Sequence, residues 1–159
     1  MADALQANRG NAPIRLTIVT PTGRVQKEGD AKAPPPGPVL DVWVDEVTAP
    51  GAQGEFQVLP GHTYLLTQLA EGEVAYKGPA GTGYFAVFGG FAEIGPDHVS
   101  ILAEGASESG EIDMAKTIAQ KEKYEKLLME IGPMDPRYDE TRKAIKELVA
   151  LMTVAQRKK

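Results

Sequence analysis

Residues 46–69 read EVTAPGAQGEFQVLPGHTYLLTQL, in which short runs of branched and aromatic residues are separated by the turn-forming stretches PGAQG and PGH. Runs of this length with glycine and proline between them are typical of β-strands joined by tight turns. The pattern extends in both directions, in IRLTIVT (14–20), VLDVWVDEVTA (39–49), EVAYK (73–77), GYFAVF (83–88), FAEIG (91–95) and HVSILAE (98–104). Eight or more short strands without a helical pattern between them predict a β-sandwich or barrel.

The periodicity becomes helical beyond Gly110. One helix is expected over about residues 111–131, ending at Gly132, and a second is expected to begin with Asp135 as N-cap and Pro136 at its first position. Steps of three and four predict one buried stripe on each helix: Ile112, Ala115, Ala119, Tyr124, Leu127, Leu128 and Ile131, then Tyr138, Thr141, Ala144, Ile145, Leu148, Met152 and Ala155. These helices should form an antiparallel αα-hairpin over residues 109–159, after a sandwich domain over 14–108. Because two helices share little core, the hairpin is expected to be mobile or to lie against another surface.

Two segments stand outside these elements. Residues 1–13 are predicted to be a flexible leader, and residues 27–38, KEGDAKAPPPGP, a proline-rich insertion in the sandwich domain. Three consecutive prolines cannot donate to a β-ladder, so the insertion should be an exposed loop rather than a strand. A PPP segment can also dock in an aromatic groove, and the sequence leaves that alternative open.

Composition limits the class of protein. The chain has 159 residues, 42% hydrophobic and 25% charged, with a net charge of −5 and no cysteine. Residues 1–110 carry 6 basic and 13 acidic side chains, and residues 111–159 carry 11 basic and 9 acidic ones. The acidic balance argues against a nucleic-acid binder, the apolar runs are too short to span a membrane, and the first residues lack a secretion signal. A cytoplasmic globular protein without disulfides is predicted.

No motif predicts catalysis. The stretch GPAGTGYF (78–85) lacks the Lys-Ser/Thr pair of a phosphate loop and leads into a strand, so it is interpreted as a hairpin turn. His62 and His98 lie 36 residues apart and outside any metal-binding pattern, and His98 is expected in a solvated turn. Asp41 and Asp45 share only same-face spacing, and no serine has GxSxG flanks. The residues alone predict a binding or coupling module.

The long motif VDEVTAPGAQGEFQVLPGHTYLLTQL, together with LTIVTPTGRV before it and GYFAVFGGFAEIGPDHVSILAEGA after it, resembles the epsilon subunit of the bacterial F-type ATP synthase. The resemblance covers about residues 16–106 closely, and the helical tail by layout. It implies a ten-stranded β-sandwich followed by a helical hairpin. It also implies a non-catalytic central-stalk subunit of the proton-translocating ATP synthase, which couples rotation between the c-ring and the catalytic head and lies peripherally on the cytoplasmic face of the inner membrane.

The resemblance implies three partners: the gamma subunit, the c-ring and, through the C-terminal helices, the alpha/beta catalytic head, where those helices can inhibit ATP hydrolysis. Glu55 occupies the turn that the family directs toward the c-ring, and His62 occupies a face used against gamma. Both residues are expected at interfaces. The sequence around His62 also places YLLTQL (64–69) in the sandwich core behind these two residues.

Some members of the family bind ATP between sandwich and hairpin through an I/L-D-x-x-R-A opening on the first helix, with further arginines along it. Here Ile112 and Asp113 match, while Lys116 replaces the arginine and Lys123 and Lys126 stand at the later positions. Lysine keeps the charge but lacks the planar fork that binds phosphate in two places. No cofactor is therefore assigned, and a sensor whose hairpin is locked down by ATP is the alternative function. A sandwich enzyme that uses either histidine is the third, least supported hypothesis.

Overall fold

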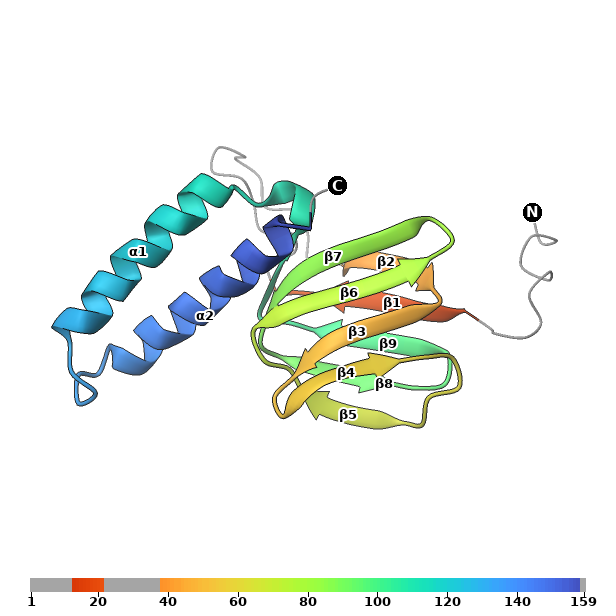
Figure 1. The fold of residues 1–159 in the computed structure, drawn as a ribbon. Helices are drawn as coiled ribbons and strands as arrows, with labels where there is room; N and C mark the ends of the chain where they lie inside the picture. Colours follow the sequence, from red (N-terminus) through yellow and green to blue (C-terminus); the bar gives the residue numbers. More distant parts are fainter. Residues whose placement is uncertain (1–12, 22–37, 158–159) are drawn as a thin grey trace.

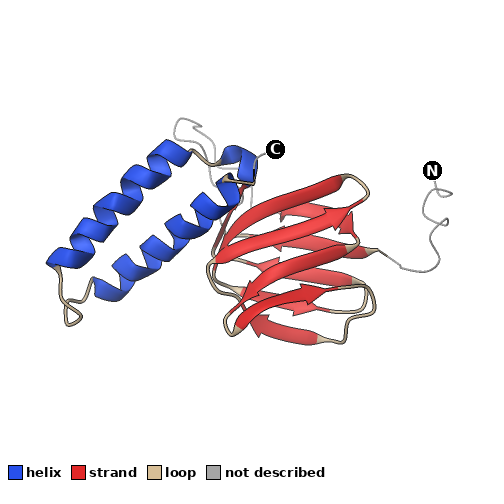
Figure 2. Ribbon diagram, in the orientation of Figure 1, coloured by secondary structure: helices blue, strands red, loops and turns tan. Residues whose placement is uncertain are grey.

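In the part of the chain that the structure describes, ten strands in two sheets precede two helices (Figures 1 and 2). The structure, a computed structural model, describes residues 13–21 and 38–157. The predicted leader and insertion therefore lie outside the described residues, apart from residue 13 and from Pro38, which begins a strand. The strands are β1 (Ile14–Val19), β2 (Pro38–Val44), β3 (Glu46–Gly51), β4 (Gly54–Val58), β5 (Leu65–Gln68), β6 (Gly72–Gly78), β7 (Gly81–Phe88), β8 (Phe91–Ile94), β9 (His98–Leu102) and β10 (Gly105–Glu108).

The strands form a sandwich of two five-stranded sheets. We call the sheet with order β2-β1-β9-β8-β5 sheet A and the sheet with order β10-β7-β6-β3-β4 sheet B. Every named strand pair is antiparallel except β1 and β9, which pair in parallel. Strand β1 shows the alternation that decides the fold, because Ile14, Leu16 and Ile18 are fully buried between the sheets while the residues between them face outward. The predicted β-sandwich is confirmed.

The apolar run in β7 is buried on both faces. Phe85 and Val87 point into the sandwich core, and Ala86, on the opposite face of the strand, is buried in a second cluster formed with the helices. A helix therefore covers the outer face of sheet B at β7, which explains why the run GYFAVF is continuously apolar rather than alternating.

The two helices, α1 (Met114–Glu130) and α2 (Tyr138–Ala155), follow a short 3-10 turn, η2 (Ser109–Glu111). They pair as a hairpin, with α2 lying between α1 and the sandwich (Figure 1). Neither helix in the described part of the chain combines the length and the apolar character needed to cross a bilayer.

Several helix details differ from the prediction. Asp113 is the N-cap of α1, and its side chain accepts a hydrogen bond from the Lys116 amide. The second helix begins later than expected, because Asp135 accepts the Arg137 amide in a turn that precedes α2. Helix α1 ends at Glu130, and its C-cap residue, Ile131, has an extended conformation. Gly132, whose φ is not positive, therefore forms no left-handed cap.

The buried stripes on both helices are only partly as predicted. On α2, the predicted Thr141, Leu148 and Ala155 are buried, together with Ala150 and Val154, which the sequence pattern did not single out. Ala115 and Ala119 are exposed, and the buried residue of the first turns is Thr117. Its hydroxyl donates to the Asp113 carbonyl oxygen at 2.7 Å, which satisfies the polar group inside the interface.

Candidate functional site

The outer face of sheet A carries exposed apolar side chains. Leu66, Phe91 and Leu102 are 71%, 54% and 56% exposed. Phe91 pairs with Leu102 across β8 and β9, and Leu66 lies diagonally from Phe91 on β5. We call these three residues the outer stripe. Native surfaces rarely leave large apolar side chains clustered in water unless another molecule covers them, so the outer stripe is a candidate interaction surface.

Charged groups flank the outer stripe on the same face. Arg15 on β1 makes a two-pronged contact with Asp41 on β2, in which Nε donates to Oδ1 at 3.0 Å and Nη2 to Oδ2 at 2.8 Å. That hydrogen-bonded pair lowers the pKa of Asp41 and raises that of Arg15. The two hydrogen bonds hold the Arg15 and Asp41 charges in fixed positions on this face.

His98 begins β9 on this face rather than lying in a solvated turn. Its Nδ1 lies 2.8 Å from Asp97 Oδ1, its Nε2 lies 3.7 Å from Glu93 Oε1, and the Tyr64 ring stands 6.4 Å away between centroids. The hydrogen bond to Asp97 raises the pKa of His98, partial burial opposes that rise, and the charges of Asp97 and Glu93 add to it. This histidine is the member of the face whose charge responds to pH near neutrality.

The two interface residues named from the sequence lie at opposite ends of β4. Glu55 is exposed on β4, opposite Pro50 in the β3–β4 hairpin. His62 follows β4, is half-buried, and its Nδ1 lies 2.6 Å from the Thr63 carbonyl oxygen. The structure therefore does not bring them together in one site.

The expectation that YLLTQL fills the core is wrong. Tyr64, Leu65 and Leu66 are exposed, and of the apolar residues in that stretch Leu69 alone is buried, at 3% exposure. Strand β5 is an edge strand of sheet A, so it has few neighbours to cover it. Three residues that sequence reasoning assigned to the core belong to the surface.

A second contact joins the hairpin to sheet B. Ala150, Val154 and Ala155 of α2 are buried with Ala86 of β7 and Ile112. Small residues on both sides let helix and strand approach closely. We call this the hairpin seam.

Charged pairs bridge the same two parts of the molecule. Lys143 Nζ donates to Glu104 Oε2 at 2.6 Å, and Arg157 Nε donates to Glu73 Oε2 at 3.1 Å. The Arg157 guanidinium also lies 5.4 Å from the centroid of the Tyr84 ring. These pairs join the mildly basic tail to the acidic body.

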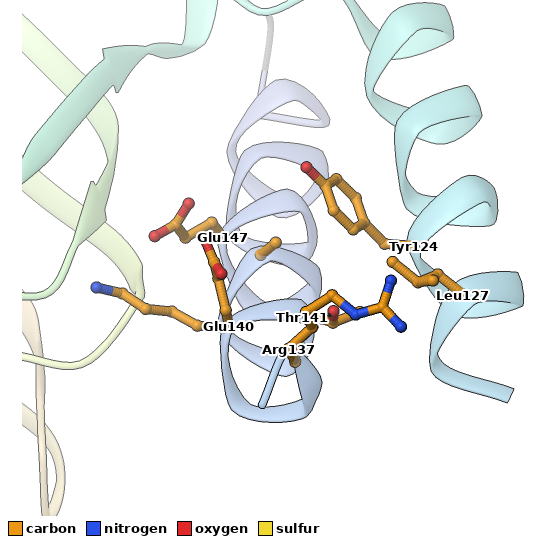
Figure 3. Close-up of a pocket in the computed structure, with 8 residues that line it drawn as sticks. Tyr124, Leu127, Arg137, Glu140, Thr141 and Glu147 are labelled. Carbon is orange, nitrogen blue, oxygen red and sulfur yellow. Dashed lines mark hydrogen bonds between the residues drawn. The ribbon is translucent and has the colours of Figure 1, made fainter. Parts of the chain in front are cut away.

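The candidate ATP residues are not assembled into one pocket. Ile112 is buried in the hairpin seam, and the Asp113 carboxylate is engaged by the Lys116 amide at 3.1 Å. Lys123 and Lys126 instead line a groove of about 710 Å³ along α1, beside Glu122 and Glu130. A separate cavity of about 540 Å³ lies where the helices face each other, lined by Tyr124 of α1 and by α2 residues that include Glu140 and Glu147 (Figure 3).

The two histidines do not share a site in the described ranges. His62 and His98 belong to different local contacts, and within residues 13–21 and 38–157 no group of three or more His, Asp or Glu side chains is placed to hold a metal ion. The arrangement provides surfaces for other molecules to bind. The outer stripe was missed from the sequence, although the alternation of Phe91 and Glu93 with Ala92 and Ile94 in β8 could have indicated an outward apolar residue.

Comparisons with known proteins give one consistent result. A family model described as "ATP synthase, Delta/Epsilon chain, beta-sandwich domain" matches residues 34–109. The chain is 39% identical over 144 residues to "ATP synthase epsilon chain 2" of Syntrophotalea carbinolica, covering 91% of this chain and 94% of the relative. It is 38% identical to "ATP synthase epsilon chain" of Syntrophobacter fumaroxidans, covering 91% and 96%. A chain in the cryo-EM structure of the Euglena gracilis mitochondrial ATP synthase with OSCP, F1 and c-ring superposes with a TM-score of 0.68 at 25% identity, covering 91% of this chain and 82% of that one.

Proposed function

The chain belongs to the epsilon-chain family of ATP synthase, and from that premise we propose that it is a non-catalytic central-stalk subunit of a bacterial F-type proton-translocating enzyme. In this role it couples rotation between the c-ring and the catalytic head, and it lies peripherally on the cytoplasmic face of the inner membrane. The proposal is supported by relatives of known family over most of the chain and by a surface suited to a protein partner.

The outer stripe is the observation that carries the proposal. The inner face of sheet A is buried in the sandwich core, whereas Leu66, Phe91 and Leu102 are exposed on its outer face. The hydrogen-bonded Arg15–Asp41 pair lies on the same outer face. An apolar centre with a charged rim is the composition of a protein interface. We assign this face to the gamma subunit, with His62 near its edge and the turn that carries Glu55 directed to the c-ring.

The assignment to gamma is tested by one substitution on the stripe and a matched one away from it. Phe91→Asp puts a charge into the proposed contact, whereas Met134→Asp makes a similar change at a hairpin residue that is 96% exposed. We expect Phe91→Asp to weaken binding of purified gamma at least about tenfold, or ~1.4 kcal/mol, and Met134→Asp to leave it unchanged. Equal binding by both variants in titration calorimetry would remove this face from the proposal.

Inhibition of ATP hydrolysis is the second part of the role, and we place it in the C-terminal hairpin. Residues 111–159 carry 11 basic and 9 acidic side chains, so they complement an acidic partner better than the body of the chain does. A chain ending at Gly110 keeps every strand of the sandwich. We expect it to fold and to raise the ATPase rate of the assembled head. An unchanged rate would remove inhibition from the role while leaving the coupling function in place.

The alternative function, an ATP-responsive sensor, retains one supporting observation. Lys123 and Lys126 line the same groove on α1, so two cations border one space into which we propose that phosphate groups enter. Calorimetry of the isolated chain with ATP and magnesium separates the two functions. Absence of heat at millimolar nucleotide rules out the sensor.

A further inference from the structure

Three carboxylates and one ammonium group influence one another where α2 faces the sandwich. Lys143 and Glu147 lie one turn apart on α2, and Lys143 donates to Glu104, which lies between β9 and β10. The negative charge of Glu71, in the bend before β6, raises the pKa of both Lys143 and Glu147. In Figure 3 the Glu147 carboxylate points to the side of α2 on which the sandwich strands lie. We call Glu71, Glu104, Lys143 and Glu147 the acidic cluster.

The acidic cluster has an excess of negative charge. Lys143 is engaged by Glu104, while Glu71 and Glu147 are both half-buried. The remaining charged groups around the adjoining cavity do not offset it, because Arg137 is paired with Asp135 and Glu140 is itself acidic. Tyr124 is the titratable group that α1 contributes to that cavity. A half-buried carboxylate next to other carboxylates is costly when ionised.

The hairpin seam provides the attraction that opposes this repulsion. Val154 lies seven residues beyond Glu147, roughly 10 Å along the helix axis, and packs with Ala86 of the sandwich. Apolar burial at the seam does not depend on pH, whereas the charge of the cluster does. On α2, the hairpin seam therefore keeps its strength when pH changes, whereas the repulsion within the acidic cluster does not keep its strength.

We propose that the acidic cluster makes docking of the hairpin on the sandwich pH-dependent, with proton uptake by Glu147 strengthening docking and its ionisation weakening it. This property belongs to the chain itself and goes beyond the proposed stalk function, which does not depend on it.

The direction follows from linkage. Burial in the docked state raises the pKa of Glu147, with Lys143 opposing the rise and Glu71 and Glu104 adding to it. When the hairpin leaves the sandwich, Glu147 enters water and its pKa returns toward the ordinary value. The docked state therefore binds the proton more tightly, so docking strengthens as pH falls through the raised pKa and levels off below the ordinary one.

The test uses the full chain, which has no cysteine of its own. Cysteines at Met134 on the hairpin and Gln57 on β4, both exposed, carry spin labels whose distance distribution gives the docked fraction by pulsed EPR. In the wild-type background we expect the docked fraction to rise from pH 8.5 to about pH 5. Glu147→Gln should be more docked than wild type at pH 8.5 and should lose the pH response.

Glu140→Gln is the matched control, because Glu140 is an exposed carboxylate of the same helix and lines the same cavity. It should keep the wild-type pH response. If the hairpin is fully docked at every pH, urea unfolding of the unlabelled proteins still tests the proposal. The free energy of unfolding of Glu147→Gln minus that of wild type must then be larger at pH 8.5 than at pH 5. A wild-type pH response in Glu147→Gln, or its equal loss in Glu140→Gln, overturns the proposal.

Discussion

Truncating one valine in the hairpin seam should show how strongly the helices are held. Val154 is 0% exposed, whereas Val149, on the same helix, is 44% exposed. Val154→Ala removes two buried methyl groups, about 1.6 kcal/mol at ~0.8 kcal/mol each, and the better helix propensity of alanine returns about 0.5 kcal/mol. Incomplete closure of the resulting cavity adds to the cost, so a net loss of about 1–2 kcal/mol is expected. Val149→Ala gains the same helix propensity but removes methyl groups that are only partly buried. Its free energy of unfolding should stay within about 0.5 kcal/mol of wild type.

Two spectroscopic probes separate the hairpin from the sandwich. Far-ultraviolet circular dichroism follows the helices, and the single tryptophan, Trp43 on β2, reports the sandwich. If the chain unfolds as one unit, both probes should show Tm lowered by about 2–8 °C in Val154→Ala, at roughly 2–4 °C for each kcal/mol lost. If the hairpin melts first, the helical transition alone should move. Indistinguishable behaviour of Val154→Ala and Val149→Ala would refute the assignment of the seam as the main apolar attachment of the hairpin.

Two further predictions concern the sandwich. His98 has a raised pKa in the folded chain, so it stabilises the fold fully below its ordinary pKa of 6.5 and loses that contribution as pH rises through the folded value. His98→Gln should therefore lower the free energy of unfolding near pH 6 and match wild type near pH 9. A deficit that is independent of pH would contradict this. Gly90 has φ of +100°, and an added Cβ would stand 2.0 Å from the Leu102 carbonyl oxygen, whereas Gly54 has φ of +134° with open space around it. Gly90→Ala should cost more than about 3 kcal/mol and Gly54→Ala about 1–2 kcal/mol in urea unfolding, and equal costs would show that backbone strain alone matters.

The strands and the second helix follow directly from local patterns. Alternation in β1 requires one face of the strand to be buried, and the stripe through Thr141, Leu148 and Ala155 requires one face of α2 to be buried. Both patterns are periodic, and each indicates one buried face whatever element packs against it. The first helix carries a weaker signal, because Ala115 and Ala119 are small enough to lie on either face.

The interaction surface could not be read in the same way. Leu66 and Phe91 have the composition of core residues. The alternation in β8 indicates that Phe91 lies on the face opposite to Ala92 and Ile94, but which face meets the other sheet depends on how β5 and β8 pair with their neighbours. That is a property of long-range strand order, which the local pattern does not contain. The charged pair between Lys143 and Glu104 has the same origin, since it joins residues that only the docked hairpin brings together.

The parallel pairing of β1 with β9 has a consequence for how the chain is synthesised. Arg15 faces His98 across the two strands, so the first strand to leave the ribosome must wait for nearly the whole sandwich to be translated before it gains its second neighbour. Until then, β1 can pair with β2 alone and presents an open edge to other nascent chains. Closure of sheet A is therefore expected to be a late, slow event, followed by pairing of β10 with β7 and by docking of the hairpin. Conditions that slow translation near residues 98–102 should prolong exposure of that edge.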